Sequence, residues 1–387
     1  MSTKLINLKE DIQRLSDDGY TVTIENNCLV VRDVPYLDET QTVREDGVLI
    51  DTYPHNPNDH TFRFSGIPHT TEGKALHVAG KVNGWNGFDV KSLLSFKKSD
   101  GKTVIAYTDH YDKVAHYILV IGSHAKGKNE KVSAQKYRPI DTSKIEDTPF
   151  QYQDLNSSRA GINHVSEKLE GQKIAIIGLG GTGSYILDLI SKSPVAEIHV
   201  YDDDIFHTHN AFRAPGAASK EALDNSIEKV AYFHDIYSKM HKGVRAHNYR
   251  VTSEVISTEF DGYDFVFICI DANEHKRVLL SKLIEKNISF IDCGIAVDEV
   301  EGSLNGTIRL TTLTANKNDH IGKRVHCDDS NQNEYDSNIQ IAELNAFNAT
   351  LAIIKWKRML GFYHNHENEH HSTYMFNCNS LSNDEKI

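Results

Sequence analysis

A short strand-like segment runs directly into a glycine-rich loop near the middle of the chain, and this junction limits the possible folds more than any other feature. Residues 173–178 read KIAIIG, and the loop GLGGTGS leads into a segment at 182–192 with apolar residues at helical spacing. The loop glycines are Gly178, Gly180, Gly181 and Gly183. Such glycines let the backbone turn tightly and approach a phosphate, which the free N–H groups at the start of a helix can bind. The junction therefore predicts a nucleotide-binding site.

Strand-like and helix-like segments alternate around this loop. Further strands are expected at 197–204, 244–251, 264–271 and 288–294, and helices at 220–240, 273–287 and 338–361. This alternation is typical of an α/β fold with a doubly wound, Rossmann-like, mostly parallel sheet. In the last helix, an apolar stripe should face the core, and Gly361 should end the helix. The stripe consists of Ile341, Leu344, Phe347, Leu351 and Ile354.

The first 150 residues have a different pattern. Short alternating apolar runs are separated by turn-rich pieces, and they follow an amphipathic helix that carries Ile12 and Leu15. The runs lie at 21–24, 28–31, 47–50, 61–64, 103–107 and 116–121. They predict a smaller β-rich α+β domain at 1–150, and the polar segment 146–158 is the expected boundary. The nucleotide-binding domain should then cover 151–361, with a polar, His-rich, solvated segment at 362–387.

Composition excludes several classes of protein. The formal charge of −12, from 42 Lys and Arg against 54 Asp and Glu, argues against a nucleic-acid partner. The five cysteines form no C-x-x-C pair, so neither a disulfide scaffold nor a Cys-based structural zinc is expected. The first 15 residues are charged and no run of 18 apolar residues occurs, so we expect a cytoplasmic protein without a membrane segment.

Charged residues follow the glycine loop at the predicted strand ends. Asp202 ends the second strand, 24 residues after the first loop glycine, where a carboxylate can accept both ribose hydroxyls. Alone, this fits an NAD(P)-dependent dehydrogenase equally well. The strand ends also supply Arg213, Lys229, Asp271 and Asn273. Cations can hold phosphates and carboxylates can hold a metal, so this set favours a nucleoside triphosphate with Mg²⁺ over a hydride cofactor.

The ordered combination of these motifs resembles the ThiF/MoeB/HesA group of ATP-dependent adenylyltransferases, which are related to ubiquitin-activating enzymes. The resemblance covers about residues 155–361 and includes an arginine ahead of the first strand. Beside GLGGTGS, it rests on Arg159, Asp202, Asp204, Asn210, Arg213, Lys229 and Asp271.

The resemblance implies a role for each part of the nucleotide site. Gly180 and its neighbours would line the adenosine and phosphates, together with Asp204 and Asn210, and Asp202 would take the ribose. Arg213 and Lys229 would neutralise the triphosphate. Arg159 would complete this clamp, often across the interface of a homodimer in such proteins.

The resemblance also implies a metal and a reaction. Asp271 would coordinate Mg²⁺, and Asn273 lies close enough in sequence to help. The C-terminal carboxylate of a ubiquitin-like protein ending in glycine would attack the α-phosphate of ATP, giving an acyl-adenylate and pyrophosphate. A catalytically inactive partner subunit that binds a ubiquitin-like protein is an alternative, although such subunits usually lack the charged residues that this chain keeps.

Many such enzymes also form a thioester on a cysteine, and Cys327 is the candidate here. It lies in a polar loop beside His326, but Asp328 and Asp329 would raise the pKa of its thiol. Adenylation does not require it. The other cysteines are expected to be structural: Cys28, Cys269, Cys293 and Cys378.

The N-terminal domain lies outside the resemblance to adenylyltransferases. Residues 29–74 look somewhat like a domain of unknown function that precedes such enzymes in bacteria, where ubiquitin-like proteins are often neighbours. A distant relation to ubiquitin-conjugating folds is suggested by Tyr53-Pro54 and the FRF motif, but His69 lies where a cysteine would act. We therefore expect a domain that recognises the modifier or its target.

Overall fold

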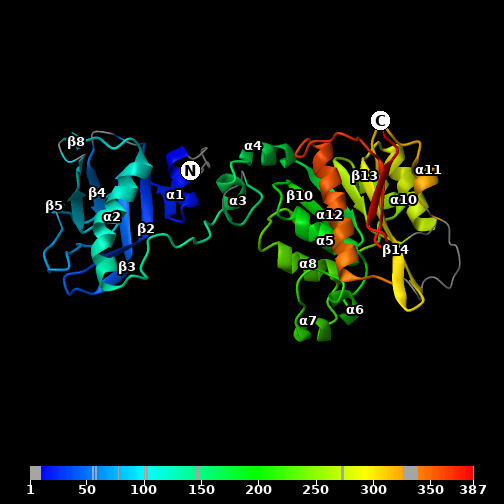
Figure 1. Cartoon of the computed structure of the whole chain (residues 1–387), viewed down its shortest axis with the longest axis horizontal. Helices are drawn as coiled ribbons and strands as arrows, with labels where there is room; N and C mark the ends of the chain where they lie inside the picture. The colour runs from blue at the N-terminus through cyan, green and yellow to red at the C-terminus, as the bar shows by residue number, and fades with distance from the viewer. Residues whose placement is uncertain are drawn as a thin grey trace. The chain divides into compact units, whose positions relative to one another are not determined.

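The computed structural model describes residues 10–54, 56, 59–76, 78–99, 101, 103–143, 148–271, 274–325, 327 and 339–386. The chain forms two compact units (Figure 1). The first contains Met1–Asp141 and Tyr152–Gly161, and the second contains Thr142–Gln151 and Ile162–Ile387. Among the described residues, no helix combines the length and the apolar character that crossing a membrane requires.

The first unit is an antiparallel sheet covered by a long helix. Its six-stranded sheet has the order β1-β2-β3-β4-β6-β5, with a separate pair of short strands, β7 and β8. The strands are β1 (Thr21–Glu25), β2 (Cys28–Leu37), β3 (Val43–Thr52), β4 (Thr61–Phe64), β5 (Val78–Lys81), β6 (Ser92–Ser95), β7 (Lys98–Ser99) and β8 (Val104–Ile105). The helices are α1 (Glu10–Asp17), α2 (His110–Lys128) and α3 (Leu155–Arg159). Helix α2 packs on β2, as Figure 1 shows.

The strand predicted at 116–121 is wrong, because these residues belong to α2. Asp109 caps this helix by accepting a hydrogen bond from the Asp112 N–H. Val114, Tyr117 and Ile121 are all fully buried, which is the spacing of one helical face. The apolar residues at 116–121 fit a helical spacing as well as an alternating one. The Asp109 cap, which starts a helix ahead of them, favours the helix.

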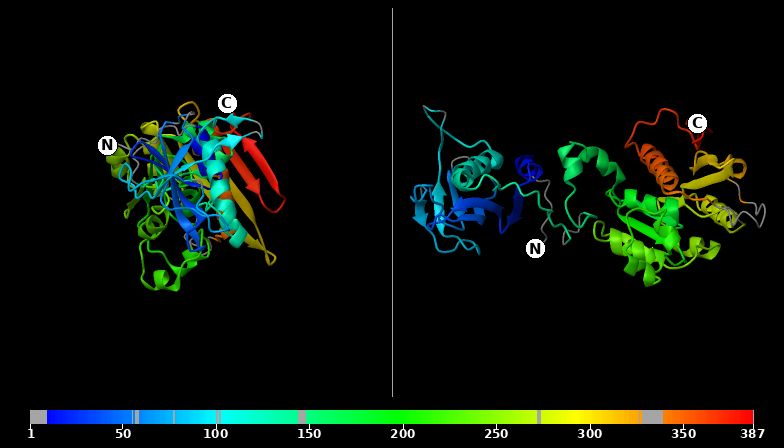
Figure 2. Two further views of the ribbon diagram at one scale, coloured as in Figure 1. Left: turned by 90° about the vertical axis from the view of Figure 1, so that its left-hand side faces the viewer. Right: turned by 60° about the horizontal axis from the view of Figure 1, so that its bottom comes forward.

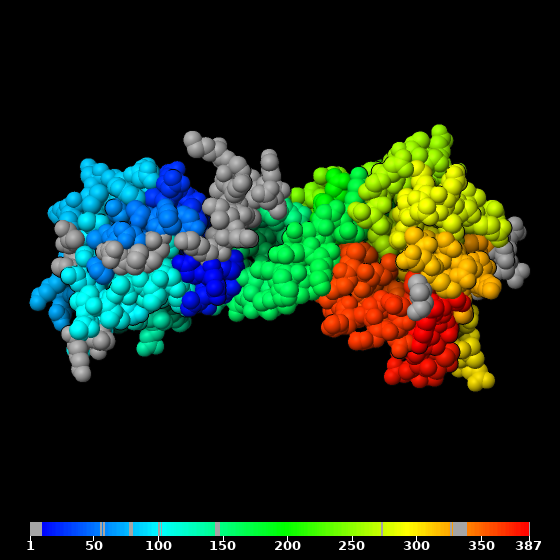
Figure 3. All heavy atoms as spheres, turned by 90° about the horizontal axis from the view of Figure 1, so that it is seen from above, coloured from blue at the N-terminus to red at the C-terminus, as the bar shows by residue number. Residues whose placement is uncertain are grey.

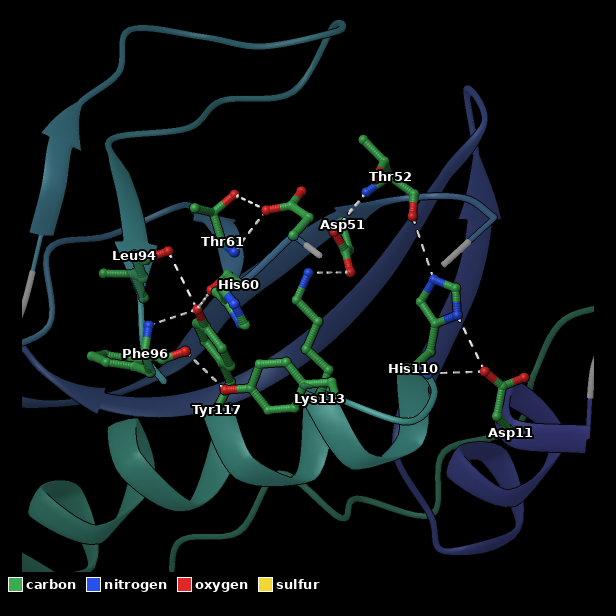
Figure 4. A network of polar contacts seen from close by, with 12 residues as sticks. Asp11, Asp51, Thr52, His60, Thr61, Leu94, Phe96, His110, Lys113 and Tyr117 are labelled. Carbon is green, nitrogen blue, oxygen red and sulfur yellow. Dashed lines mark hydrogen bonds and ion pairs between the residues drawn. The ribbon is translucent and has the colours of Figure 1, made fainter. Parts of the chain in front are cut away.

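Two pairs of charged or polar side chains are buried where α2 meets β3 and α1 (Figure 4). Lys113 Nζ lies 2.7 Å from Asp51 Oδ2, and His110 Nδ1 lies 3.2 Å from Asp11 Oδ2, which also accepts from the His110 backbone N–H. Burial raises the pKa of Asp51, and the charge of Lys113 opposes this shift. Because removing one partner would leave the other buried and unpaired, these contacts fix how α2 sits on the sheet.

The second unit is an eight-stranded sheet with helices on both faces, which confirms the predicted α/β fold. The order is β11-β10-β9-β12-β13-β14-β15-β16, parallel from β11 to β13 and antiparallel beyond. The strands are β9 (Lys173–Ile177), β10 (Glu197–Tyr201), β11 (Val244–His247), β12 (Phe265–Ile268), β13 (Phe290–Val300), β14 (Ser303–Leu313), β15 (His371–Met375) and β16 (Ser380–Asp384).

Helices α5, α8 and α12 contribute to the core on one face of this sheet, and α9 and α10 to the core on the other. The helical elements are α4 (Asn163–Ser166), the 3₁₀ turn η1 (Glu167–Leu169), α5 (Gly181–Ile190), α6 (Thr208–Ala211), α7 (Lys220–Asp224), α8 (Lys229–Tyr237), α9 (Ser253–Glu259), α10 (Glu274–Glu285), α11 (Ile321–Arg324) and α12 (Ala342–Met359).

The single helix predicted at 220–240 is two helices, α7 and α8. The break contains Ser226, whose φ is +49°. Because of this break, Lys229 is the first residue of α8, and its backbone N–H donates to the Asp204 carbonyl at 2.9 Å. The interruption thus holds the lysine beside the acidic end of β10.

Only part of the apolar stripe predicted for the last helix faces the core, where Leu351 packs. Phe347 and Ile354 are each 37% exposed, whereas Ala349, Ala352 and Trp356 are fully buried. The buried face thus combines two alanines with the bulky Trp356, and α12 packs against α5. The predicted helix stop is confirmed, since α12 ends at Met359 and Gly361 has φ +74°.

The segment after α12 is more ordered than the solvated tail that we expected. Strands β15 and β16 form the last two strands of the sheet (Figure 2), and Leu310 of β14 pairs with Ser372. His370 and His371 are buried, and buried Glu369 contacts Lys355 of α12. This segment and α12 form neighbouring parts of the surface in Figure 3. Pairing of β15 with β14 therefore gives the backbone of this polar segment the hydrogen bonds that order it.

His241 predicts a loss of stability in mild acid. Its Nδ1 accepts from the Gly243 N–H and its Nε2 donates to the Val195 carbonyl, both at 3.0 Å, so the folded chain holds the neutral ring. Burial lowers the pKa of His241 to about 4 from the ordinary 6.5. The unfolded chain binds the extra proton first as pH falls, so the free energy of unfolding should drop between pH 6.5 and 4, by about 2–3 kcal/mol for this group.

Urea unfolding of the wild type and of His241→Gln at several pH values checks this prediction. The other histidines are common to both proteins, so the difference between the two pH profiles isolates His241. Parallel profiles would contradict the assignment.

Candidate active site

A pocket of about 420 Å³ lies in the second unit, where the carboxyl ends of β9, β10 and β12 meet the middle of β13. Ligand sites of open α/β sheets form at this edge. The pocket brings together most of the charged residues and loop glycines singled out in the sequence. These are Gly178, Gly180, Gly181, Asp202, Asp204, Arg213, Lys229 and Asp271.

The glycine loop follows β9 and begins α5, as the sequence predicts. Gly178 has φ +91°, and a Cβ there would lie 2.7 Å from the Cys269 carbonyl oxygen. A Cβ on Gly183 would lie 1.9 Å from the Gly178 carbonyl oxygen, so this glycine lets α5 pack on the loop. Gly180 has open space beside it and lines the pocket. The loop backbone is therefore accessible to a ligand.

Asp202 and Lys229 connect the glycine loop to the start of α8. Asp202 Oδ2 accepts from the Leu179 N–H at 2.7 Å. Buried Lys229 places its Nζ 3.3 Å from Asp202 Oδ1 and 2.6 Å from Asp204 Oδ2. The hydrogen bond from Lys229 holds the pKa of Asp204 below its ordinary value. The lysine therefore lies at the loop and is bound to two carboxylates.

Arg213 and Asp271 lie in the wall of the same pocket. Burial lowers the pKa of the Arg213 guanidinium, and the negative charge of Asp271 opposes this shift. Arg213 Nε is buried and has no hydrogen-bond partner among the described residues. A buried donor without an acceptor is costly, so this group is suited to an anionic ligand.

The residues present fit a magnesium ion. Asp271 offers an exposed carboxylate in the pocket. Asp202, Asp203 and Asp204 form a second group, whose carboxylate oxygens lie within 4.8 Å of one another. Mg²⁺ binds through one or two carboxylates together with phosphate oxygens. Asp203 was not singled out in the sequence, although it lies between two residues that were.

Besides Gly183 and Cys327, three predicted site residues lie away from the pocket lining or outside the described residues. Asn210 is buried and accepts from the His207 N–H at 2.8 Å, which caps α6, and it does not line the pocket. Arg159 belongs to the first unit, where it donates to the Asp17 carbonyl at 3.0 Å. Asn273 lies outside the described residues.

Cys327 is buried, and burial raises the pKa of its thiol. It packs in the core that contains Ile321 and Val325. Asp328 and Asp329, which were expected from the sequence to raise this pKa, lie outside the described residues. As described, its environment does not activate a thiol nucleophile. Of the remaining cysteines, Cys28 and Cys293 are buried as expected, Cys269 is half-buried, and Cys378 is exposed.

Three cations in the pocket wall, Arg250, Lys276 and Arg309, were missed in the sequence. Lys276 lies on α10, and Arg309 lies on β14 opposite Gly294 of β13. An ionisable residue inside an apolar strand could have pointed to this part of the pocket. Asp292 interrupts the apolar segment ISFIDCG, and Arg309 interrupts the segment GTIRLTTL.

Comparison with known proteins adds the family. A domain of unknown function, DUF6791, matches residues 10–155. Ubiquitin-like modifier-activating enzyme 5 of Drosophila grimshawi is 20% identical over 153 residues, covering 36% of this chain and 37% of that protein. The enzyme of the same name from Culex quinquefasciatus is 20% identical over 195 residues, covering 46% and 48%. The chain thus spans less than half the length of these curated relatives.

Among solved structures, E. coli MccB with ATP is 15% identical, with a TM-score of 0.46, covering 60% of this chain and 69% of that one. The ThiF family model matches residues 154–387, which include the glycine loop and every residue that lines the pocket. The match extends over more than half of the sequence, and the chain therefore belongs to the ThiF family.

Proposed function

We propose that this chain uses ATP and Mg²⁺ to adenylate the C-terminal carboxylate of a ubiquitin-like protein, with release of pyrophosphate. The observation that carries the proposal is the convergence of Asp202, Arg213, Lys229 and Asp271 on one pocket beside the glycine loop. Membership of the ThiF family and the likeness to enzymes named for activating ubiquitin-like modifiers support it.

The chain's own residues act by binding and positioning. N–H groups of the glycine loop and the start of α5 hold phosphate oxygens, and Arg213 supplies a donor that lacks an acceptor among the described residues. Lys229 is bound to Asp202 and Asp204. Nucleotide binding would let Asp202 accept the ribose hydroxyls while Lys229 turns toward the phosphates.

The metal has one task in this proposal. When bound, Mg²⁺ neutralises negative charge on the phosphate oxygens and so makes the α-phosphate easier to attack. Asp271 is the proposed ligand, helped by Asn273, and the group Asp202–Asp204 is a second source of carboxylate oxygens. Charge stabilisation of this kind needs no general base, because a carboxylate is already a nucleophile at neutral pH.

The partners are proposed from the relatives. The substrate is a ubiquitin-like protein ending in glycine, and the N-terminal domain at 1–150 recognises it or its target. Arg159 belongs to the first unit, and we propose that a homodimer brings it to the ATP site of a second copy. Cys327 would need release from its buried position before it could form a thioester.

Pyrophosphate exchange into ATP tests the proposed function. Full-length chain is incubated with ATP, Mg²⁺ and labelled pyrophosphate, with and without candidate ubiquitin-like proteins. We expect exchange that depends on both Mg²⁺ and one of these proteins, and that disappears when the protein's C-terminal glycine is deleted.

Two results would contradict the proposal. Tight NAD binding without Mg²⁺, together with no binding of ATP, would favour a dehydrogenase. Binding of a ubiquitin-like protein without any exchange would indicate an inactive partner subunit.

A further inference from the structure

A cluster of charged side chains forms part of the pocket wall away from the acidic end of β10. It consists of Lys276 on α10, Asp292 on β13 and Arg309 on β14. Lys276 Nζ lies 2.5 Å from Asp292 Oδ1, and Arg309 Nη2 lies 2.9 Å from Asp292 Oδ2. Lys276 and Arg309 line the pocket. One carboxylate is therefore shared by two cations.

The cluster is largely buried, with Arg309 half-buried at its edge. The side chains of Asp292 and Lys276 are 0% and 2% exposed, and that of Arg309 is 18% exposed. A buried cation is costly unless an anion neutralises it. Among the described residues, Arg309 has no carboxylate of its own, because Asp292 also contacts Lys276. This part of the pocket thus carries an arginine charge that a ligand anion could neutralise.

The surroundings fix the direction of Arg309. Its Nη1 donates to the Arg324 carbonyl and its Nη2 donates to Asp292. Its guanidinium lies on Gly294, where a Cβ would come within 2.6 Å of Nη2. An arginine has five N–H donors, so donors remain for a ligand in the pocket. Held in this way, the fork is suited to a carboxylate.

The acidic side of the pocket is unsuited to the same task. Asp202, Asp203 and Asp204 gather there, and each is already paired, since Lys229 contacts Asp202 and Asp204 and Arg250 contacts Asp203. A substrate carboxylate would be repelled from these residues and attracted toward Arg309. The charges therefore separate the nucleotide ribose and metal from a second, anion-binding part of the same pocket.

We propose that Arg309 binds the carboxylate that attacks ATP, and that Lys276 and Asp292 are positioning residues for it. The inference rests on the proposed adenylation. In that step a carboxylate oxygen forms a bond to the α-phosphorus, the bond from this phosphorus to the oxygen bridging to the β-phosphate breaks, and pyrophosphate leaves with the electron pair. The competing source of the anion is a phosphate of ATP itself.

The test uses the full chain with two small probes, N-acetylglycylglycine and its neutral C-terminal amide. Their dissociation constants are measured by ligand-observed NMR with and without α,β-methylene ATP, and that of a fluorescent mant-ATP is measured separately. The variants are Arg309→Met, Arg309→Lys as a rescue that keeps the charge, and Arg245→Met as a control. Arg245 is exposed on β11 and does not line the pocket.

We expect the wild type to bind the acid at least tenfold more tightly than the amide. Arg309→Met should lose this preference, Arg309→Lys should keep part of it, and Arg245→Met should match the wild type. The affinity for mant-ATP should stay within twofold in all of them. Arg309→Met should still fold, because Lys276 continues to pair with Asp292.

Two results would overturn the inference. Equal binding of acid and amide by the wild type would show that the pocket has no carboxylate subsite. A tenfold loss of mant-ATP affinity in Arg309→Met would assign the arginine to a phosphate. Failure of the wild type to bind mant-ATP would contradict the adenylation instead, and the titrations without nucleotide would still decide whether Arg309 selects the acid.

Discussion

Asp271→Asn should lower Mg²⁺-dependent pyrophosphate exchange by about two to three orders of magnitude, the range seen when one electrostatic group of a transition state is removed. The substitution keeps the shape of the side chain and removes the charge that would bind the metal. Asp271 lies in the pocket wall and is exposed, so the loss of its charge should not unfold the chain. Exchange rates measured over a range of Mg²⁺ concentrations check this, and the variant should need more Mg²⁺ for half-maximal exchange.

Asp261→Asn is the matched control, since Asp261 is exposed, pairs with Lys286 and lies outside the pocket. It should exchange like the wild type. If Asp271→Asn did so too, the metal would not depend on Asp271. Asp203→Asn would then become the informative variant, because Asp203 belongs to the other group of carboxylates that could hold the ion.

The part of the site nearest the glycine loop was predictable because its residues are close to strand ends in sequence. Asp202 and Asp271 were each predicted at the end of a strand, and parallel strands meet at one edge. Asp202, Asp271 and Gly180 therefore could be placed in one pocket without a structure. The break before Lys229 could not, because 220–240 has no glycine or proline to mark it.

The other part of the site depends on pairings between distant segments. Arg309 reaches the pocket because β14 pairs with β13 in a register that sets it opposite Gly294. Phe347 and Ile354 were expected in the core but are 37% exposed, because packing against other elements such as α5, and not apolar spacing alone, decides which face of α12 is buried. Local pattern predicts an element, but the face that becomes buried is decided by what packs against it.

Gly183→Ala should have the largest effect on the nucleotide pocket without touching a charged group. The new Cβ would lie 1.9 Å from the Gly178 carbonyl oxygen and 3.3 Å from the Cys269 Cβ. Both Gly183 and Gly178 belong to the junction of the loop with α5, so the backbone of one must move. Overpacking of this kind costs about 1–3 kcal/mol, and alanine's better helix propensity returns only about 1 kcal/mol.

The displaced loop should lower the affinity for mant-ATP by at least tenfold, because the N–H groups that bind phosphate belong to the part of the chain that must shift. Fluorescence titration measures the affinity, and thermal unfolding measures the loss of stability.

Gly180→Ala is the matched control for the loss of stability, because it adds the same methyl group three residues earlier. Gly180 has φ −69°, and a Cβ there meets nothing within 4 Å. Its melting temperature should therefore stay near that of the wild type, while that of Gly183→Ala falls. Equal melting temperatures and equal mant-ATP affinities for Gly183→Ala and the wild type would mean that α5 does not need its close approach to the loop. Packing against the Gly178 carbonyl would then not explain why the loop has a glycine at position 183.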